Sequence, residues 1–188
     1  MRPTRHLFLT GDVQSGKSTL IDRLLAMHPQ WRTGGFRTVT APPTDSQGSR
    51  PVYILPAGRP DAARGPRNLV GIRHGTGQRT ALPEGFEEAG VEILSLSDQA
   101  DLILMDEVGT MENDAPAFQE KLLGVLDGGI PVLGVLKKKN TPLLRAVISR
   151  PDVRVIRVSL DTFDASLALA NSLLCEIMEN RGALHLIP

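Results

Sequence analysis

The chain has 188 residues, enough for one well-buried core and too few for two large ones, so we expect a single domain over residues 1–188. Its 21 basic and 21 acidic residues balance, so the net charge gives no attraction to nucleic acid or to a membrane surface. The sequence shows no signal-peptide core and no apolar run long enough to cross a bilayer, and its single cysteine excludes an internal disulfide. We therefore expect a cytoplasmic protein that binds neither membranes nor nucleic acid.

The first predicted elements are a short strand at residues 7–9, a loop, and a helix with apolar residues at positions 20, 21, 24 and 25, which Pro29 ends. The loop fits the phosphate-binding pattern G-x-x-x-x-G-K-[ST] at every fixed position. Strand, loop and helix follow in the order that this motif requires; the alternative is a chance glycine turn before a helix. We expect a nucleotide to contact Gly11, Asp12, Val13, Gln14, Ser15, Gly16, Lys17, Ser18 and Thr19.

Each residue type in this loop meets a need of a bound polyanion. Gly11 and Gly16 permit backbone angles that turn successive N–H groups toward an anion at the positive end of a helix. Lys17 brings a mobile charge to the β- and γ-phosphates and is a catalytic candidate, and the Ser18 hydroxyl is suited to bind Mg²⁺. The carboxylate of Asp12 would repel phosphate, so we expect it to point away.

Residues 34–40 indicate a second strand, and residues 44–84 then differ from the rest of the chain. Proline and glycine become frequent in this segment, apolar periodicity fades, and every cation is an arginine. We interpret it as an excursion from the core, in which residues 51–55 and 69–72 pair as a small hairpin. We also predict that it is a mobile flap whose arginines reach the transferred phosphate; the alternative is that they only solubilise a loop. The candidates are Arg50, Arg64, Arg67, Arg73 and Arg79.

The apolar run at residues 102–105 is typical of a strand covered on both faces, and it ends in Asp106 and Glu107. Asp106 is suited to position Mg²⁺, and Glu107 to orient or deprotonate the water that attacks the γ-phosphorus. Glu107 reaches the nucleotide only if the chain leaves the strand at this point, and Gly109 permits such a turn. Acids at a strand end are otherwise often solvated loop residues.

Helices and strands continue to alternate in the rest of the chain. A helix begins near Pro116, strands follow at residues 131–136 and 153–158, and helices at residues 143–148 and about 163–180. This alternation predicts an α/β fold with three layers, in which a mainly parallel, doubly wound sheet lies between helices. Because open parallel sheets bind ligands at the carboxyl ends of their strands, the glycine loop and the acidic pair should share one crevice. The basic run at residues 137–139 lacks interleaved aromatics, so it indicates a solvated surface or part of the nucleotide site rather than a nucleic-acid site.

These residues also carry a family resemblance, which extends over most of the chain. The glycine loop at residues 11–19, the stretch 35–38, the run Asp106-Glu107-Val108-Gly109-Thr110-Met111-Glu112 and Phe118 resemble the THEP1-type nucleoside-triphosphatases. The resemblance implies a RecA-like P-loop fold with strand order 5-1-4-3-2 and Mg²⁺-dependent hydrolysis of ATP, GTP and other nucleoside triphosphates. In that order, Lys137 would lie near the γ-phosphate and act as a sensor or charge stabiliser.

The chain departs from the family at two places: Val13 stands where the family usually has a proline, and Leu160-Asp161-Thr162 where it has an Asn-Arg pair. No Asn-Lys-x-Asp motif for reading guanine is present, which argues against a dedicated GTPase. The resemblance implies broad base specificity. The leading hypothesis is therefore a slow nucleoside-triphosphate hydrolase. Two alternatives remain open: a nucleotide or small-molecule kinase whose lid is the arginine-bearing segment, and a nucleotide-dependent adaptor with little turnover.

Overall fold

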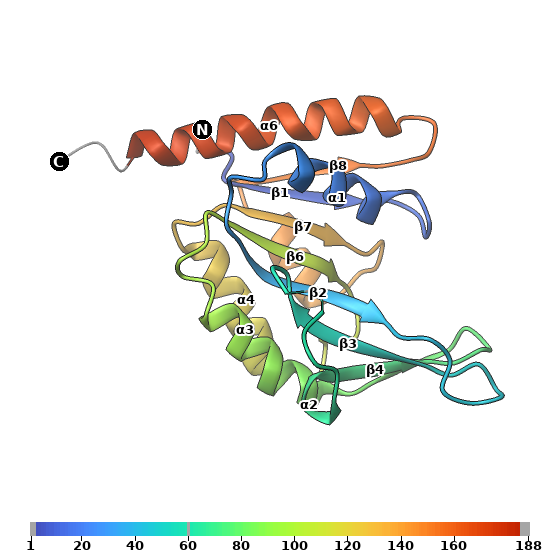
Figure 1. Ribbon diagram of the computed structural model, residues 1–188. Helices are drawn as coiled ribbons and strands as arrows, with labels where there is room; N and C mark the ends of the chain where they lie inside the picture. The colour runs from blue at the N-terminus through green and yellow to red at the C-terminus, as the bar shows by residue number, and fades with distance from the viewer. Residues whose placement is uncertain (1–2, 60, 185–188) are drawn as a thin grey trace.

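A computed structural model describes residues 3–59 and 61–184, and they form one mixed sheet between helices (Figure 1). The strands are β1 (His6–Thr10), β2 (Thr33–Thr40), β3 (Arg50–Pro56), β4 (Leu69–Arg73), β5 (Arg79–Ala81), β6 (Leu102–Val108), β7 (Val132–Leu136) and β8 (Val153–Arg157). The helices are α1 (Lys17–Met27), α2 (Pro83–Gly85), α3 (Val91–Ser95), α4 (Pro116–Asp127), α5 (Pro142–Ile148) and α6 (Phe163–Leu184). A 3₁₀ turn (Pro66–Asn68) precedes β4, and a π-helical turn (Phe86–Gly90) joins α2 to α3.

The strands lie in the order β5-β4-β3-β2-β6-β7-β1-β8. The parallel strands among them are β8, β1, β7, β6 and β2, and counting these along the chain gives 5-1-4-3-2. The predicted strand order is therefore confirmed. Among the described strands β8 pairs with β1 alone, so it forms one edge of the sheet.

The segment at residues 44–84 is not a separate excursion, because its strands extend the main sheet. The predicted hairpin exists, since β3 and β4 pair antiparallel, but β3 also pairs along its length with β2, and β5 adds a further strand. Ile54, Leu55 and Val70 are fully buried in this extension. The sequence pattern missed this because prolines and glycines in the connecting loops obscure the short alternation within each strand.

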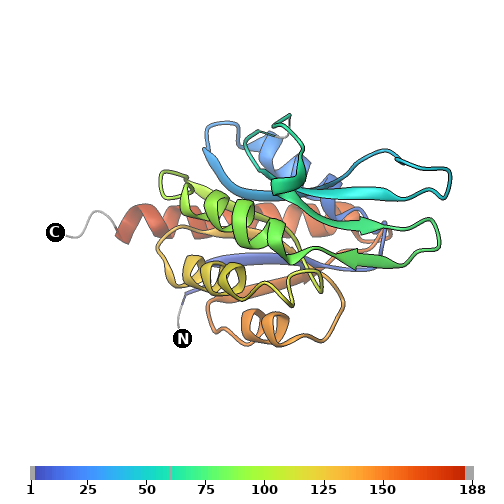
Figure 2. The same ribbon diagram turned by 90° about the horizontal axis from the view of Figure 1, so that it is seen from below.

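Helices cover both faces of the sheet, which confirms the three-layer architecture (Figures 1 and 2). Helices α1 and α6 lie on one face, where Leu20, Leu24 and Leu174 pack against strands β1, β6 and β7. Helices α3, α4 and α5 lie on the other face, in a second apolar cluster that includes Leu122 and Leu143. None of the helices in the described ranges is both long and apolar enough to span a membrane.

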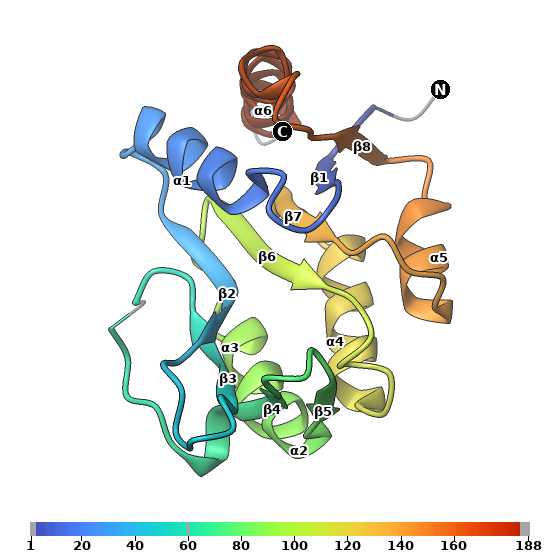
Figure 3. The same ribbon diagram turned by 90° about the vertical axis from the view of Figure 1, so that its right-hand side faces the viewer.

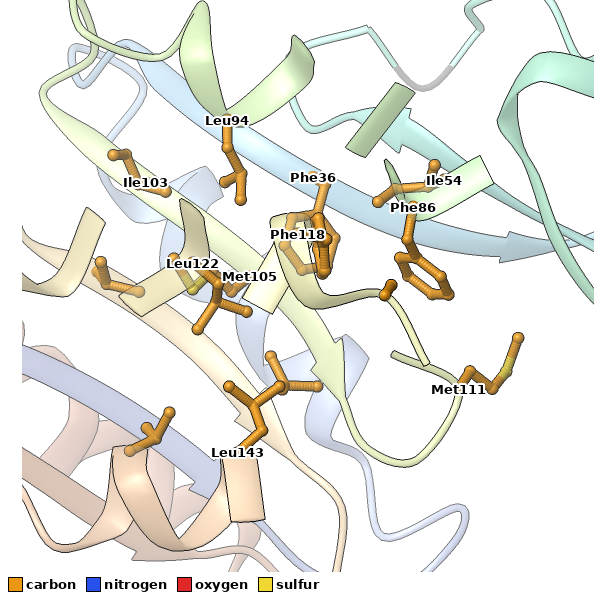
Figure 4. Packing of buried hydrophobic residues seen from close by; sticks show 14 of the residues in the cluster. Phe36, Ile54, Phe86, Leu94, Ile103, Met105, Met111, Phe118, Leu122 and Leu143 are labelled. Carbon is orange, nitrogen blue, oxygen red and sulfur yellow. The ribbon is translucent and has the colours of Figure 1, made fainter. Parts of the chain in front are cut away.

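Aromatic side chains fix the segments around the acidic strand β6 (Figure 4). The ring of Phe118 on α4 packs against Phe36 of β2 at 5.4 Å between centroids and against Phe86 of the π-helical turn at 5.0 Å. All three rings are fully or almost fully buried. This cluster ties β2, the π-helical turn and α4 together, and it sets the position of the loops that leave the carboxyl end of the sheet.

Candidate nucleotide site

A cavity of about 870 Å³ lies where the parallel strands end at their carboxyl side. Figure 3 looks onto this side, with the β1–α1 loop above and the β4–β5 hairpin below. The structure brings every predicted site residue to its wall: Gly11, Asp12, Val13, Gln14, Ser15, Gly16, Lys17, Ser18, Thr19, Asp106, Glu107 and Lys137. Thr38, Thr40 and Thr110, which the sequence did not assign to the site, also line it. So do Lys138 and Lys139 of the basic run, for which the sequence left open either a solvated surface or part of the nucleotide site.

The glycine loop has the backbone geometry that its sequence predicted. Gly11 and Gly16 adopt φ values of 158° and 91°, and Gln14 between them adopts 62°. A Cβ atom at Gly11 would lie 2.3 Å from the carbonyl oxygen of Val158, so neither the angle nor the space admits a side chain there. Gly16 is the N-cap of α1, so the loop delivers its N–H groups to the positive end of that helix.

Lys17 is held inside the loop by oxygen acceptors. Its Nζ donates to the carbonyl oxygens of Gly11 (3.1 Å) and Asp12 (2.5 Å) and to Oγ of Ser15 (3.1 Å). Burial lowers the pKa of Lys17, and the carboxylates of Glu107 and Asp12 oppose this shift. The ammonium group therefore lies at the centre of the loop, where a phosphate oxygen can take over its hydrogen bonds.

The carboxylate of Asp12 points out of the loop, as we expected from its charge. Its Oδ1 accepts a hydrogen bond from Nζ of Lys138 at 2.7 Å, and its side chain is mostly exposed. This hydrogen bond lowers the pKa of Asp12, with a further contribution from the charge of Lys138. The pair ties the glycine loop to the basic run after β7, which places that run at the cavity.

Asp106 is a buried carboxylate at the end of β6. Its nearest cationic partner is Arg37 of β2, whose Nη1 lies 3.9 Å from Oδ2 and whose Nη2 forms a shorter ion pair, at 2.7 Å, with Asp22 of α1. Burial raises the pKa of Asp106 to about 6; Arg37 partly offsets this, and the charges of Glu107 and Asp22 add to it. A carboxylate that is desolvated and only weakly paired favours a further cation at this position.

Strand β6 is distorted at Glu107, one residue before the strand ends at Val108. Glu107 adopts φ = 74°, a left-handed value that is rare for a residue with a side chain, and the pairing with β7 is irregular between Met105 and Val108. This turn places the carboxylates of Asp106 and Glu107 on the same cavity. We expected Gly109 to permit this turn, but the residue with the left-handed backbone angle is Glu107.

Gly109 instead makes room for Lys137. A Cβ atom at Gly109 would lie 2.3 Å from Cδ of Lys137. The lysine side chain thus passes directly over the glycine, and its Nζ reaches Oε2 of Glu107 at 3.2 Å. Glu107 of β6 and Lys137, the residue after β7, therefore form an ion pair on the cavity wall.

Glu112 stabilises the turn that follows β6. Its side chain is buried, and both carboxylate oxygens accept from the backbone N–H of Gly109, at 3.2 and 3.1 Å. Burial raises the pKa of Glu112, whereas the N–H bonds and the charge of Lys137 oppose that rise. Helix α4 begins only at Pro116, so Glu112 belongs to the turn after β6 and not to the helix.

The five candidate arginines of residues 44–84 lie in different places. Arg73 and Arg79 line the cavity that contains the glycine loop. Arg64 and Arg67 line a separate cavity of about 540 Å³ between β3 and α3, and Arg67 forms an ion pair with Glu92 at 2.8 Å. Nε of Arg50 donates to the carbonyl oxygen of Ala41 at 3.0 Å. The structure thus leaves Arg73 and Arg79 as the arginines of this set that face the site.

A glycine loop between the first strand and its helix, facing an acidic strand end across one cavity in a 5-1-4-3-2 sheet, defines the P-loop NTPase class. The family model described as NTPase matches residues 6–173, which is most of the chain. The chain therefore belongs to the family of THEP1-type nucleoside-triphosphatases.

Sequence relatives and solved structures agree with this assignment. The chain is 31% identical to nucleoside-triphosphatase THEP1 of Methanosarcina barkeri over 71% of this chain and 76% of that protein. It is 28% identical to nucleoside-triphosphatase THEP1 of Thermotoga maritima over 94% of this chain and 97% of that protein. The crystal structure of THEP1 from Aquifex aeolicus is similar in fold, with a TM-score of 0.69 and 20% identity over 90% of this chain and 98% of that one.

Proposed function

We propose that this protein hydrolyses nucleoside triphosphates to diphosphate and phosphate, with Mg²⁺ and with broad base specificity. The observation that carries the proposal is the single cavity in which Lys17 of the glycine loop meets Asp106 and Glu107 of β6. The family relatives named nucleoside-triphosphatase support the reaction type. The absence of a guanine-reading Asn-Lys-x-Asp motif in the sequence supports broad specificity.

The available oxygen donors fit Mg²⁺. Ser18 lies in the first turn of α1 and Asp106 at the end of β6, and both line the cavity. Residues 3–59 and 61–184 contain no group of three or more His, Cys, Asp or Glu side chains arranged to hold a metal alone. This suits an ion that takes most of its ligands from substrate phosphates and water, as Mg²⁺ does. When bound, Mg²⁺ neutralises charge on the β- and γ-phosphates.

Different residues of the chain bind the phosphates, activate the water and stabilise the charge of the transferred group. The N–H groups of Gly11 to Thr19 and the ammonium of Lys17 bind and orient the phosphates. Glu107 orients the attacking water and accepts its proton, and Lys137 stabilises charge on the γ-phosphate. Glu107 and Lys137 pair with each other at 3.2 Å, and we propose that this pair opens before Glu107 acts as a base. We propose that this opening contributes to a slow turnover.

The test is phosphate release from a panel of nucleoside triphosphates, with and without a small-molecule extract and with and without Mg²⁺. Phosphate release that needs Mg²⁺ but no extract supports a hydrolase. Loss of ATP only in the presence of extract, without free phosphate, would instead identify a kinase. Nucleotide binding with no consumption of ATP in any arm would leave the adaptor as the better description.

A further inference from the structure

Three arginines lie side by side across the antiparallel extension of the sheet. Arg50 of β3 is paired with Arg73 of β4, and Arg73 is paired with Arg79 of β5. Residues that are paired directly across neighbouring strands project from the same face of a sheet, with Cβ atoms about 5 Å apart. The three side chains, which we call the arginine row, therefore leave one face of the sheet next to one another.

The arginine row is a local concentration of positive charge without acidic partners. None of the ion pairs found among residues 3–59 and 61–184 includes Arg50, Arg73 or Arg79. Arg67 of the same segment, in contrast, pairs with Glu88 and Glu92. Like charges placed directly opposite each other destabilise a sheet because they repel. A bound anion would offset the repulsion between these arginines.

Two members of the arginine row, Arg73 and Arg79, face the cavity of the glycine loop. Gly77, in the turn of the hairpin that joins them, lines that cavity as well. The segment after Glu107 packs on the same strand, because a Cβ atom at Gly71 would lie 2.4 Å from the terminal methyl of Met111. Gly71 is two residues from Arg73. These two arginines and the acidic turn are therefore neighbours on the cavity wall.

We propose that Arg73 and Arg79 form a phosphoryl-binding site that is separate from the glycine loop. Guanidinium groups present pairs of N–H donors that match two oxygens of a phosphate, which explains why this part of the wall carries arginine. Arg50 does not line the cavity, but as the cross-strand neighbour of Arg73 it adds positive charge beside the site. The phosphoryl group is either the terminal one of the nucleotide or that of a second, phosphorylated small molecule. Which of these two molecules supplies the phosphoryl group depends on the proposed function. The existence of the binding site does not depend on it.

The first experiment uses inorganic phosphate as the probe and titration calorimetry as the measurement. The parent is Lys17→Ala, which removes the charge of the glycine loop. Adding Arg73→Gln and Arg79→Gln should weaken phosphate binding about tenfold or more, because hydrogen bonds from charged donors contribute at least that factor. The control adds Arg154→Gln, which removes an exposed arginine from β8 at the opposite edge of the sheet and should change nothing. Equal phosphate affinity of the parent and the double-arginine variant would overturn the proposal.

Thermal unfolding of the same variants checks their fold and gives a second readout. Without anion, removing the arginines should leave Tm unchanged or raise it, since like-charge repulsion is relieved. Phosphate should raise the Tm of the parent more than that of the double-arginine variant. An equal rise in both proteins would contradict the proposed site.

Competition in the wild-type protein identifies the source of the phosphoryl group. The glycine loop is saturated with a nucleoside diphosphate or with a non-hydrolysable triphosphate, and phosphate binding is measured again. Phosphate that still binds in both cases assigns the site to a second molecule, and phosphate displaced only by triphosphate assigns it to the end of the nucleotide. Displacement by both would place the phosphate in the glycine loop and overturn the separate site. If neither nucleotide binds, the proposed function fails while the calorimetric result for the arginines stands.

Discussion

Folding buries a histidine that must stay neutral, and this makes stability depend on pH. His6 of β1 is fully buried, and its Nε2 donates to the carbonyl oxygen of Leu126 at 3.0 Å. Its Nδ1 has no hydrogen-bond partner among the described residues. Burial lowers the pKa of His6 from 6.5 to about 4; Asp152 opposes this shift, and the charges of Arg5 and Arg150 add to it.

The sign and size of the effect follow from this pKa. Between pH 6.5 and about 4 the unfolded chain binds a proton at His6 and the folded protein does not, so stability falls as the pH is lowered. One pKa unit corresponds to about 1.4 kcal/mol, so the full loss is about 3 kcal/mol. At pH 5 the unfolded state is already almost fully protonated at His6, and the contribution of this residue to the free energy of unfolding should be lower by about 2 kcal/mol than at pH 7.5.

The assay is urea unfolding followed by far-UV circular dichroism at pH 7.5 and pH 5. Fluorescence is less suitable because the emission of the only tryptophan, Trp31, also depends on its stacking on the ring of His28, at 3.9 Å between centroids. His6→Gln keeps a donor for Leu126 but cannot be protonated. The wild type should lose about 2 kcal/mol more than this variant between the two pH values. His74→Gln, on the β4–β5 hairpin, is the control and should follow the wild type.

The wild type must be compared with the histidine variants because Asp106 titrates in the same pH range as His6, and its effect on stability has the opposite sign. Its pKa is raised to about 6, so the folded protein binds the extra proton and acid favours folding at that residue. Asp106 is present in all three proteins, so its contribution cancels in the difference. Wild type and His6→Gln with parallel pH profiles would refute the assignment of a buried neutral histidine.

Four further substitutions test the site. Lys17→Ala should weaken triphosphate binding and nearly abolish turnover, and phosphate release at the wild-type rate would contradict the phosphate-site assignment. Glu107→Gln should keep Mg²⁺-nucleotide binding and lose about 10²- to 10⁴-fold in kcat. Asp106→Asn should raise the Mg²⁺ concentration needed for activity; an identical Mg²⁺ defect in both variants would disprove their separate roles. Gly109→Ala should displace Lys137 and lower kcat more than it changes KM, whereas Gly124→Ala, with free space around it, should retain activity. Equal kinetics of these two glycine variants would show that the position of Lys137 is unimportant.

The sequence by itself determined the features that depend on neighbouring residues. The glycine spacing around Lys17 predicted a loop that the structure shows with left-handed backbone angles at Gly16 and Gln14. Alternating apolar runs and helical spacing predicted the layers, because secondary-structure periodicity and burial are local properties. The acidic pair at the end of β6 was also predicted, since residues at a strand's carboxyl end must lie at the edge of a parallel sheet.

Only the tertiary structure decided how segments that are distant in the chain meet. The left-handed turn at Glu107 follows from the irregular pairing of β6 with β7, and no local pattern marks it. The room that Gly109 leaves for Lys137 depends on the same two strands. Likewise, the sequence indicates only loop cations at Arg50, Arg73 and Arg79. The register of strands β3, β4 and β5 is what aligns their side chains in a row. A register shift of one residue would send each arginine to the other face, so the pairing rather than the residue types sets where this charge lies.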